Sequence, residues 1–365
     1  MQKKLIALAI AGLVSAPVFA QSNVTIYGVA DAYMGFGSHA DNDFAGVESG
    51  GLSGSRLGFR GTEDLGNGLK AVYTFEQGYK VDDGTGLGGN SRQSFVGLAG
   101  AFGAVTLGRQ YAPGYDFQYD ALQSSAALSP QSILSREVGS TIDASNGARW
   151  NNSVAYNGMF SGLKVRAIYS MQANENSKDY SSPSTGPDWT DPSDDDAAGL
   201  GVEYANGPLK VGAVYHYLQG AESGTKDQRE WLVGGSYNFG MLTLAMSYQD
   251  ASNLGKIKDQ DGDLWQVGVI VPVGAAGNVH VAYGEMDIDN YYGHNDDGKA
   301  KSYTLAYTHA LSKRTTAYTG WNRTDNDRGM TFGAVDYQNK NDVSGAGFKG
   351  GDNADLFVVG VRHTF

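Results

Sequence analysis

The most informative part of the sequence reads Leu163-Lys164-Val165-Arg166-Ala167-Ile168-Tyr169-Ser170-Met171. Apolar residues occupy every second position, and polar residues occupy most of the positions between them. A period of two places successive side chains on opposite faces of a β-strand. The same alternation recurs at 242–249 and 302–307. The pattern therefore predicts many strands, each with one apolar face and one wet face.

The connections between these strands are of two kinds. Short turns rich in Gly and Asn, which tolerate positive φ, lie at 65–68, 100–103, 205–208, 239–240 and 310–313. Long polar segments lie at 37–54, 80–91, 111–148, 172–196, 219–229, 251–262, 288–300 and 324–352. Such loops, alternating with short turns, predict about sixteen antiparallel strands with both chain ends on the short-turn side.

Composition excludes several other classes of protein. The chain has 365 residues, with 52 Gly, 22 Tyr and no Cys, and a mean hydropathy of −0.34. Abundant Gly disfavours a helical protein, and the low hydropathy excludes a bundle of transmembrane helices. Without Cys there are no disulfides and no Cys-based metal or catalytic sites. A formal net charge of −12 argues against a nucleic-acid partner.

The first twenty residues have the layout of a secretory signal. Lys3 and Lys4 precede an apolar stretch at 5–14, and Val18 and Ala20 stand where a signal peptidase reads the chain. A stretch of this length is too short for a hydrocarbon core of ~30 Å, which needs about 20 residues. We therefore expect residues 1–20 to be cleaved and residues 21–365 to form a single domain.

A transmembrane β-barrel explains the pattern better than a soluble β-sandwich. A barrel turns the apolar face of every strand to lipid, keeps the other face wet and closes to remove its edges. Aromatic residues near strand ends, such as Tyr73, Tyr156, Tyr204 and Tyr237, suit the two membrane interfaces. The expected fold class is therefore all-β.

Longer motifs run through the mature chain. They read Val24-Thr25-Ile26-Tyr27-Gly28-Val29-Ala30-Asp31, Ser55-Arg56-Leu57-Gly58-Phe59-Arg60-Gly61-Thr62-Glu63-Asp64-Leu65-Gly66-Asn67-Gly68-Leu69-Lys70-Ala71, Leu107-Gly108-Arg109-Gln110 and Val359-Gly360-Val361-Arg362-His363-Thr364-Phe365. In these motifs the chain resembles the trimeric general-diffusion porins of Gram-negative outer membranes, in particular the beta-proteobacterial and neisserial branch. The resemblance covers essentially the whole mature chain.

The resemblance implies a water-filled channel in the cell outer membrane, through which ions and small hydrophilic solutes diffuse passively. It implies a homotrimer, with outer-membrane lipid and lipopolysaccharide around it and no cofactor. It also implies that a third loop, 111–148, folds into the lumen and narrows the pore. The terminal Phe365 matches the signal that the outer-membrane assembly machinery reads.

Strand parity and the resemblance together predict the constriction. The expected residues are Arg56, Arg60, Glu76, Arg92 and Arg149 on the wall and Asp116 and Asp120 on the third loop. Parity places Arg149 inside and Trp150 toward lipid. Because a basic wall opposite an acidic loop produces a transverse field, we expect a modest preference for small anions.

Arg92 is the exception to this parity. It shares the phase of Val96 and Leu98, which look outward, so a regular strand directs it to lipid. Either a bulge re-aims Arg92, or the residue lies above the regular strand.

Other functions stay open at this stage. A substrate-specific channel has the same sequence features, and an adhesin accounts for the long loops but not for the basic wall. A barrel enzyme needs a nucleophile beside a base. The six histidines are scattered, although His216 and His280 have inward parity. Because no catalytic motif accompanies these residues, and Asp259, Asp261 and Asp263 do not fit a calcium-binding loop, we expect neither catalysis nor a metal site.

Overall fold

The computed structural model describes residues 23–39, 42–122, 125–143, 148–171, 195–220, 224–291, 297–327, 330, 332–333, 351 and 353–365. The predicted signal at 1–20 and most of the predicted loops 172–196 and 324–352 lie outside these residues. The strands are β1 (Asn23–His39), β2 (Asn42–Ser49), β3 (Arg56–Gly66), β4 (Leu69–Gly78), β5 (Ser91–Gly100), β6 (Gly103–Tyr111), β7 (Arg149–Phe160), β8 (Leu163–Ser170), β9 (Ala197–Asn206), β10 (Leu209–Leu218), β11 (Gln228–Asn238), β12 (Thr243–Ser252), β13 (Gly262–Val273), β14 (Gly277–Ile288), β15 (Gly298–Ala310), β16 (Thr315–Asn326) and β17 (Ala354–Thr364). The helices are α2 (Pro113–Asp116), α3 (Pro130–Arg136) and the 3₁₀ turn η2 (Leu254–Lys256). In this part of the chain no helix has the length and apolarity of a membrane-spanning helix.

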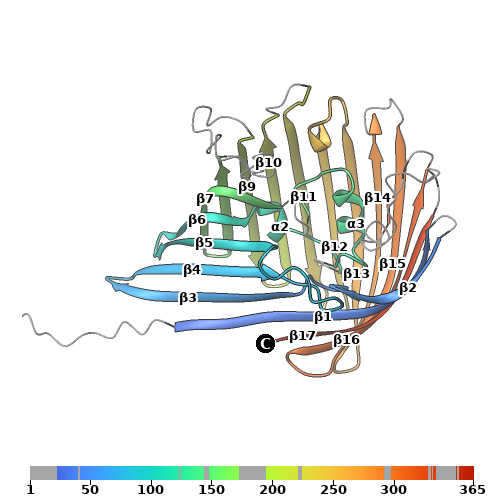
Figure 1. The fold of residues 1–365 in the computed structure, drawn as a ribbon, viewed down its shortest axis with the longest axis horizontal. Coiled ribbons are helices and arrows are strands. Elements are labelled where there is room, and N and C mark those ends of the chain that lie inside the picture. The colour runs from blue at the N-terminus through green and yellow to red at the C-terminus, as the bar shows by residue number, and fades with distance from the viewer. Residues whose placement is uncertain are drawn as a thin grey trace, which may run out of the picture.

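The strands form one closed antiparallel barrel (Figure 1). Strand β1 closes it by pairing with β17 on one side and with both β2 and β3 on the other. Because β2 pairs with Ala32–His39 and β3 with Asn23–Val29, these two segments are halves of one interrupted strand. The seventeen segments of the described chain therefore make sixteen barrel strands, as the sequence predicts.

Both described chain ends lie on the short-turn side, as expected for an even number of strands. The Gly28 N–H donates to the Phe365 carbonyl at 3.1 Å, and the Phe365 N–H donates to the Gly28 carbonyl at 3.2 Å. At the β3–β4 turn Asn67 has a φ of 54°, a left-handed conformation that Asn tolerates. The β11–β12 turn uses Gly240 with a φ of 84°. The short turns are thus where the sequence places them.

The outer face is apolar and carries an aromatic girdle. Val24 and Leu305 are 58% and 53% exposed on it. Neighbouring strands bring their rings together, with Trp265 and Tyr283 5.1 Å apart and Tyr283 and Tyr303 5.0 Å apart. Amphipathic rings of this kind suit a membrane interface, where one end is apolar and the other is wet.

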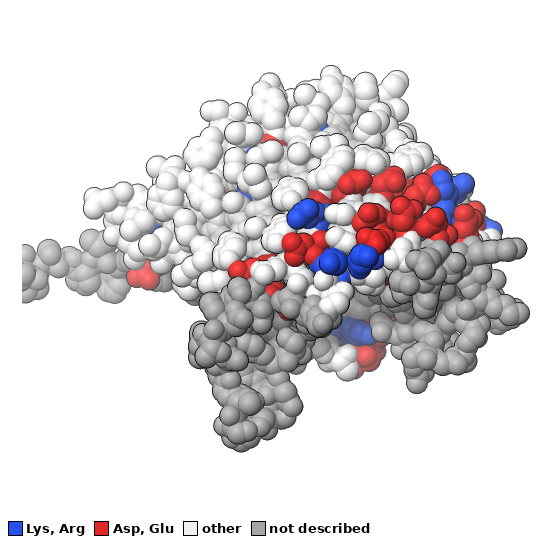
Figure 2. All heavy atoms as spheres, turned by 90° about the horizontal axis from the view of Figure 1, so that it is seen from above, with Lys and Arg blue, Asp and Glu red and all other residues white. Residues whose placement is uncertain are grey.

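A charged band follows the girdle toward the long-loop ends of β12 to β17. Asp250, Asp263 and Asp287 are register neighbours across β12, β13 and β14. Lys299 binds Asp287 at 3.0 Å, and Arg323 binds Asp355 at 2.9 Å. Figure 2 shows a band of acidic side chains with basic ones among them, beside a wide face with few charges. Much of the negative charge thus lies outside the lumen.

The first long loop differs from the expectation. The segment 37–54 was predicted to be a loop, but the end of β1 and the whole of β2 form a hairpin there. Backbone pairing stabilises a strand whether or not its side chains alternate. Strand segments that extend beyond the apolar outer face of the barrel therefore cannot be recognised from alternating hydrophobicity.

The described part of the third long loop, 111–122, 125–143 and 148, lies inside the barrel, where α2 and α3 stand against the inner face of the sheet (Figure 1). Phe117, Tyr119 and Ile142 pack on Val214 and Leu232 of β10 and β11. Burial of such side chains stabilises the docked loop by ~1.5–3 kcal/mol each. The predicted inward fold of this loop is confirmed.

Candidate functional site

Glu76 of β4 connects several elements of the inner wall of the barrel. Its side chain is buried, and its carboxylate accepts a hydrogen bond from Arg92 Nε at 2.8 Å. The hydroxyls of Tyr27 and Tyr111 donate to the same carboxylate at 2.9 and 3.0 Å. One acidic group thus joins β1, β4, β5 and the start of the third loop.

Arg92 reaches Glu76 because β5 contains a bulge. Gln77 lies opposite Ser91 and Glu76 lies opposite Gln93, which leaves Arg92 as the extra residue. An extra residue changes the side-chain phase of a strand. Of the two alternatives that the sequence leaves open for Arg92, the bulge is confirmed.

A pair of tyrosines from the third loop completes an arginine cluster, which we define as Arg56, Arg92 and Arg149. Tyr111 and Tyr115 stack at a centroid distance of 3.7 Å. Arg92 Nη2 donates to the Tyr115 hydroxyl at 3.2 Å, and the Arg149 guanidinium lies 5.7 Å from the Tyr111 ring. Arg56 interacts electrostatically with both Glu76 and Tyr115. Three guanidinium groups therefore gather around the tyrosine pair, and two of them, Arg56 and Arg92, also act on the Glu76 carboxylate.

Arg60 extends this cluster toward the short-turn side. It is exposed to the lumen, and its guanidinium lies 4.8 Å from the centre of the Tyr27 ring. A cation over the face of an aromatic ring is held electrostatically without being neutralised.

The acidic residues of the third loop do not form a face opposite the arginines. Asp116 pairs with Arg166 of β8, which also donates to the Tyr111 carbonyl at 2.6 Å. Asp120 is buried and accepts hydrogen bonds from the Leu122 N–H at 2.6 Å and from the Ser129 hydroxyl. Burial raises the pKa of the Asp120 carboxyl. The expectation that Asp120 lies in the constriction is therefore not met, because its carboxylate stabilises the turn before α3.

Sequence comparison now identifies the family. A family model described as Gram-negative porin matches residues 7–329. The chain is also 35% identical over 379 residues to outer membrane porin protein 32 of Delftia acidovorans, with 100% of both chains covered. The chain belongs to the Gram-negative porin family. It is thus an outer-membrane β-barrel that forms a channel for passive diffusion of ions and small hydrophilic solutes.

Two further relatives support this assignment. The porin is 30% identical to a solved anion-selective porin from Comamonas acidovorans, with a TM-score of 0.76 and coverage of 94% of this chain and 100% of that chain. Over 120 residues it is 46% identical to the major outer membrane protein P.IB of Neisseria gonorrhoeae, covering 31% and 33% of the two chains. Membership of a channel-forming family favours a channel over an enzyme.

Trp150 of the porin is not at the lipid face. The side chain is only 2% exposed and packs with Ala155 and Ile168 on the inner side. The pairing of β6 and β7 is irregular next to it, and Asn152 has a φ of 46°. This irregularity changes the phase between Val154 and Trp150, so the predicted lipid contact of Trp150 is wrong.

Two inward histidines of the porin hold the third loop. His216 Nε2 accepts the Gly114 N–H at 3.1 Å, and its Nδ1 lies 2.8 Å from the Thr141 hydroxyl. His280 Nδ1 lies 3.0 Å from the Ala121 carbonyl. Inward parity pointed to both residues, but nothing in the sequence indicated that their partners are loop atoms.

Glu230 of β11 is the residue that sequence reasoning missed. It is fully buried and accepts hydrogen bonds from the Thr141 N–H at 2.9 Å, the Thr141 hydroxyl at 2.7 Å and the Ser140 hydroxyl at 2.5 Å. Gln228 Nε2 adds a bond at 2.7 Å. Because three donors of residues 140–141 bond to this one carboxyl group, Glu230 is the main polar anchor of that segment.

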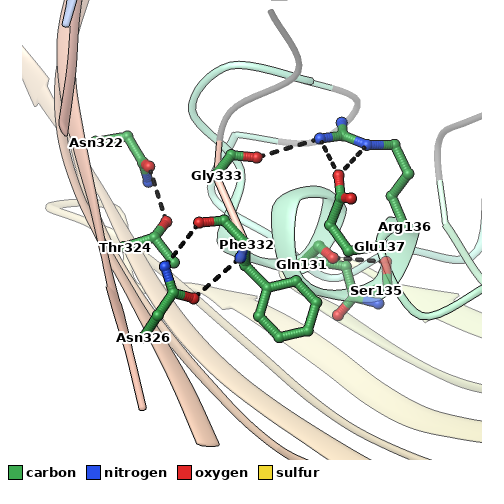
Figure 3. Close-up of polar contacts among 9 residues, drawn as sticks. All are labelled: Gln131, Ser135, Arg136, Glu137, Asn322, Thr324, Asn326, Phe332 and Gly333. Atoms are coloured by element: carbon green, nitrogen blue, oxygen red, sulfur yellow. Dashed lines mark hydrogen bonds and ion pairs between the residues drawn. The ribbon is translucent and has the colours of Figure 1, made fainter. Parts of the chain in front are cut away.

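The described part of the last long loop meets the third loop at the channel mouth (Figure 3). Arg136 of α3 donates from Nη2 to the Gly333 carbonyl at 3.3 Å and pairs with Glu137 at 3.0 Å. Asn326 of β16 donates to the Phe332 carbonyl at 2.9 Å and accepts the Phe332 N–H at 3.1 Å. The buried Phe332 ring lies 5.8 Å from that of Tyr291. These contacts connect α3 to the last loop.

Within the described residues, no group of three His, Asp or Glu side chains is arranged to hold a metal ion.

Proposed function

We propose that the porin prefers small anions and that the arginine cluster sets this preference. Arg56 and Arg92 act on the Glu76 carboxylate and Arg149 lies against the Tyr111 ring, so three positive charges gather near one negative charge where the third loop meets the wall. Charges at the narrowest part of a pore decide which ions enter. The observation that carries the proposal is the Arg92–Glu76 pair, which with the bulge in β5 turns Arg92 to the inner side of the wall.

The electrostatic picture differs from a basic wall that faces an acidic loop. Asp116 is paired with Arg166, and the Asp120 carboxylate is bound by donors of its own loop. The proposed preference therefore comes from an unbalanced positive charge and not from a transverse dipole. The anion-selective porin from Comamonas acidovorans supports the sign, since it is 30% identical over nearly the whole chain.

Substitution of the cluster tests this proposal. Arg56→Gln, Arg92→Gln and Arg149→Gln each keep polarity but remove one charge, so each should lower the chloride-to-potassium permeability ratio. Lys313→Gln at the β15–β16 turn removes the same charge away from the cluster and serves as the control. Equal ratios in the cluster variants and the control contradict the proposal.

We propose in addition that the porin is exported by cleavage after Ala20 and assembles as a homotrimer. A mature protein that begins at Gln21, and current that appears in groups of three steps, are the expected results. A mature chain that keeps residues 1–20, or single current steps only, contradicts these proposals.

The assembly signal and the lipid surroundings are also proposals. The Phe365 ring is partly exposed beside Gly28, and we propose that the assembly machinery recognises it. Phe365→Ala should lower the amount of porin in the outer membrane, whereas an unchanged amount contradicts this role. We propose that the basic side chains of the charged band, Lys299 and Arg323, lie beside the phosphate-bearing head groups of lipopolysaccharide.

We propose no catalytic role for the porin. His216 and His280 are the two histidines with inward parity, and both hold loop atoms.

A further inference from the structure

A second polar feature lies on the inner wall between the arginine cluster and the short turns. It is a recess of about 650 Å³ formed by β1 and β3 to β7, which lie side by side in Figure 1. Thr25, Arg60, Lys70, Thr74, Phe95 and Asn157 are among its lining residues. Pockets of 300–1,000 Å³ are typical of small-molecule sites.

Two cations of the recess are available to a ligand. Arg60 and Lys70 are both exposed, and in the described part of the chain neither forms an ion pair. Asp64 lies opposite Lys70 in the strand register, but its carboxylate accepts the Gly66 N–H at 2.9 Å in the turn. The recess therefore keeps a positive excess even when Asp64 is counted.

The rest of the lining offers hydroxyl and amide groups. Thr25 and Thr74 flank Arg60 as its register partners on β1 and β4. Threonine hydroxyls both donate and accept, so they bind an oxyanion as well as a ligand hydroxyl. Asn157 contributes an amide, and Phe95 adds an apolar surface. This combination suits a ligand that has both a negative group and hydroxyls.

We propose that the recess is a binding subsite for small solutes that carry an oxyanion, either phosphate or carboxylate, together with hydroxyl groups. The inference rests on the proposed anion preference: the arginine cluster admits anions, and the recess retains the hydroxylated ones. Chloride should bind only weakly in the recess, because this ion has no hydroxyl groups and fills only a small part of the volume.

Single-channel recording tests the proposal. Glycerol phosphate, inorganic phosphate or glycerol is added to porin channels in potassium chloride, and the chloride current is measured against concentration. The current should fall in a saturable manner with glycerol phosphate, at lower concentration than with inorganic phosphate, and should not saturate with glycerol. Arg60→Gln and Lys70→Gln should each raise the half-blocking concentration of glycerol phosphate about fivefold, the value for one exposed charge contact.

The control and the selectivity measurement separate the possible failures. Lys313→Gln removes a lysine from a short turn outside the recess and should leave the half-blocking concentration unchanged. A current without saturable block, or equal effects of Lys70→Gln and Lys313→Gln, overturns the recess. If the same channels still prefer anions, only the proposed binding subsite is contradicted. If they prefer cations, the proposed anion preference is contradicted as well.

Discussion

Loss of the Glu230 carboxylate should loosen the third loop without opening the barrel. In Glu230→Ala, the Ser140 hydroxyl, the Thr141 N–H and the Thr141 hydroxyl lose their acceptor. A buried donor left unmatched costs about 1–3 kcal/mol. Because lumen water reaches part of the loop, we take the lower limit of this cost for each donor. Three donors then destabilise the docked segment by about 3 kcal/mol. That free energy raises the population of the detached segment by about 150-fold.

The effect should stay local, because other anchors of the third loop remain. His216 still accepts the Gly114 N–H, and His280 still lies beside the Ala121 carbonyl. Hydrogen exchange at the Thr141 amide should therefore speed up by about 150-fold, while exchange in the barrel strands stays unchanged. The open-channel current should become noisier.

Glu63→Ala is the matched control, because Glu63 is an exposed carboxylate near the β3–β4 turn. This variant should leave both measurements unchanged. The reasoning is refuted if Glu230→Ala keeps the Thr141 exchange rate of the unmodified porin, or if exchange rises equally throughout the barrel.

Three further predictions follow from the wall and the mouth. Glu76→Gln should increase anion preference, because it removes the carboxylate beside Arg92, and a zero-current potential that moves toward cations contradicts this. Phe332→Ala should detach the last loop from the mouth and speed hydrogen exchange in α3, whereas unchanged exchange argues against the contact. In single-tryptophan variants, brominated lipid should quench Trp265 but spare the inward Trp150, and equal quenching is inconsistent with the assigned faces.

The sequence predicts the barrel well because lipid and water impose a strict period of two. The opening motif at 163–171 corresponds to β8, with Ile168 buried on the inner side. Beyond the apolar belt this constraint ends, so the hairpin of β1 and β2 has no comparable signal. Loop boundaries are therefore the part of the fold that pattern analysis places least well.

Bulges limit the prediction of the site. The bulge at Arg92 can be predicted, because a charge on the lipid face costs ~2–4 kcal/mol. A regular strand, which would direct Arg92 to lipid, is therefore disfavoured. The sequence contains no comparable sign of the irregularity beside Trp150, because an indole ring suits a lipid face and a buried cluster equally. The sequence does contain one sign of the role of Asp120. Ser129-Pro130 is a typical helix start, and the hydroxyl of this serine donates to the Asp120 carboxylate. Partners of this kind depend on the fold of the loop and are not encoded in a local period.

The most direct test of the central claim is the zero-current potential of the unmodified porin in a potassium chloride gradient across a planar bilayer. The three arginines of the arginine cluster predict a potential of the sign that chloride permeation produces. A potential of the opposite sign, set by potassium, contradicts the account.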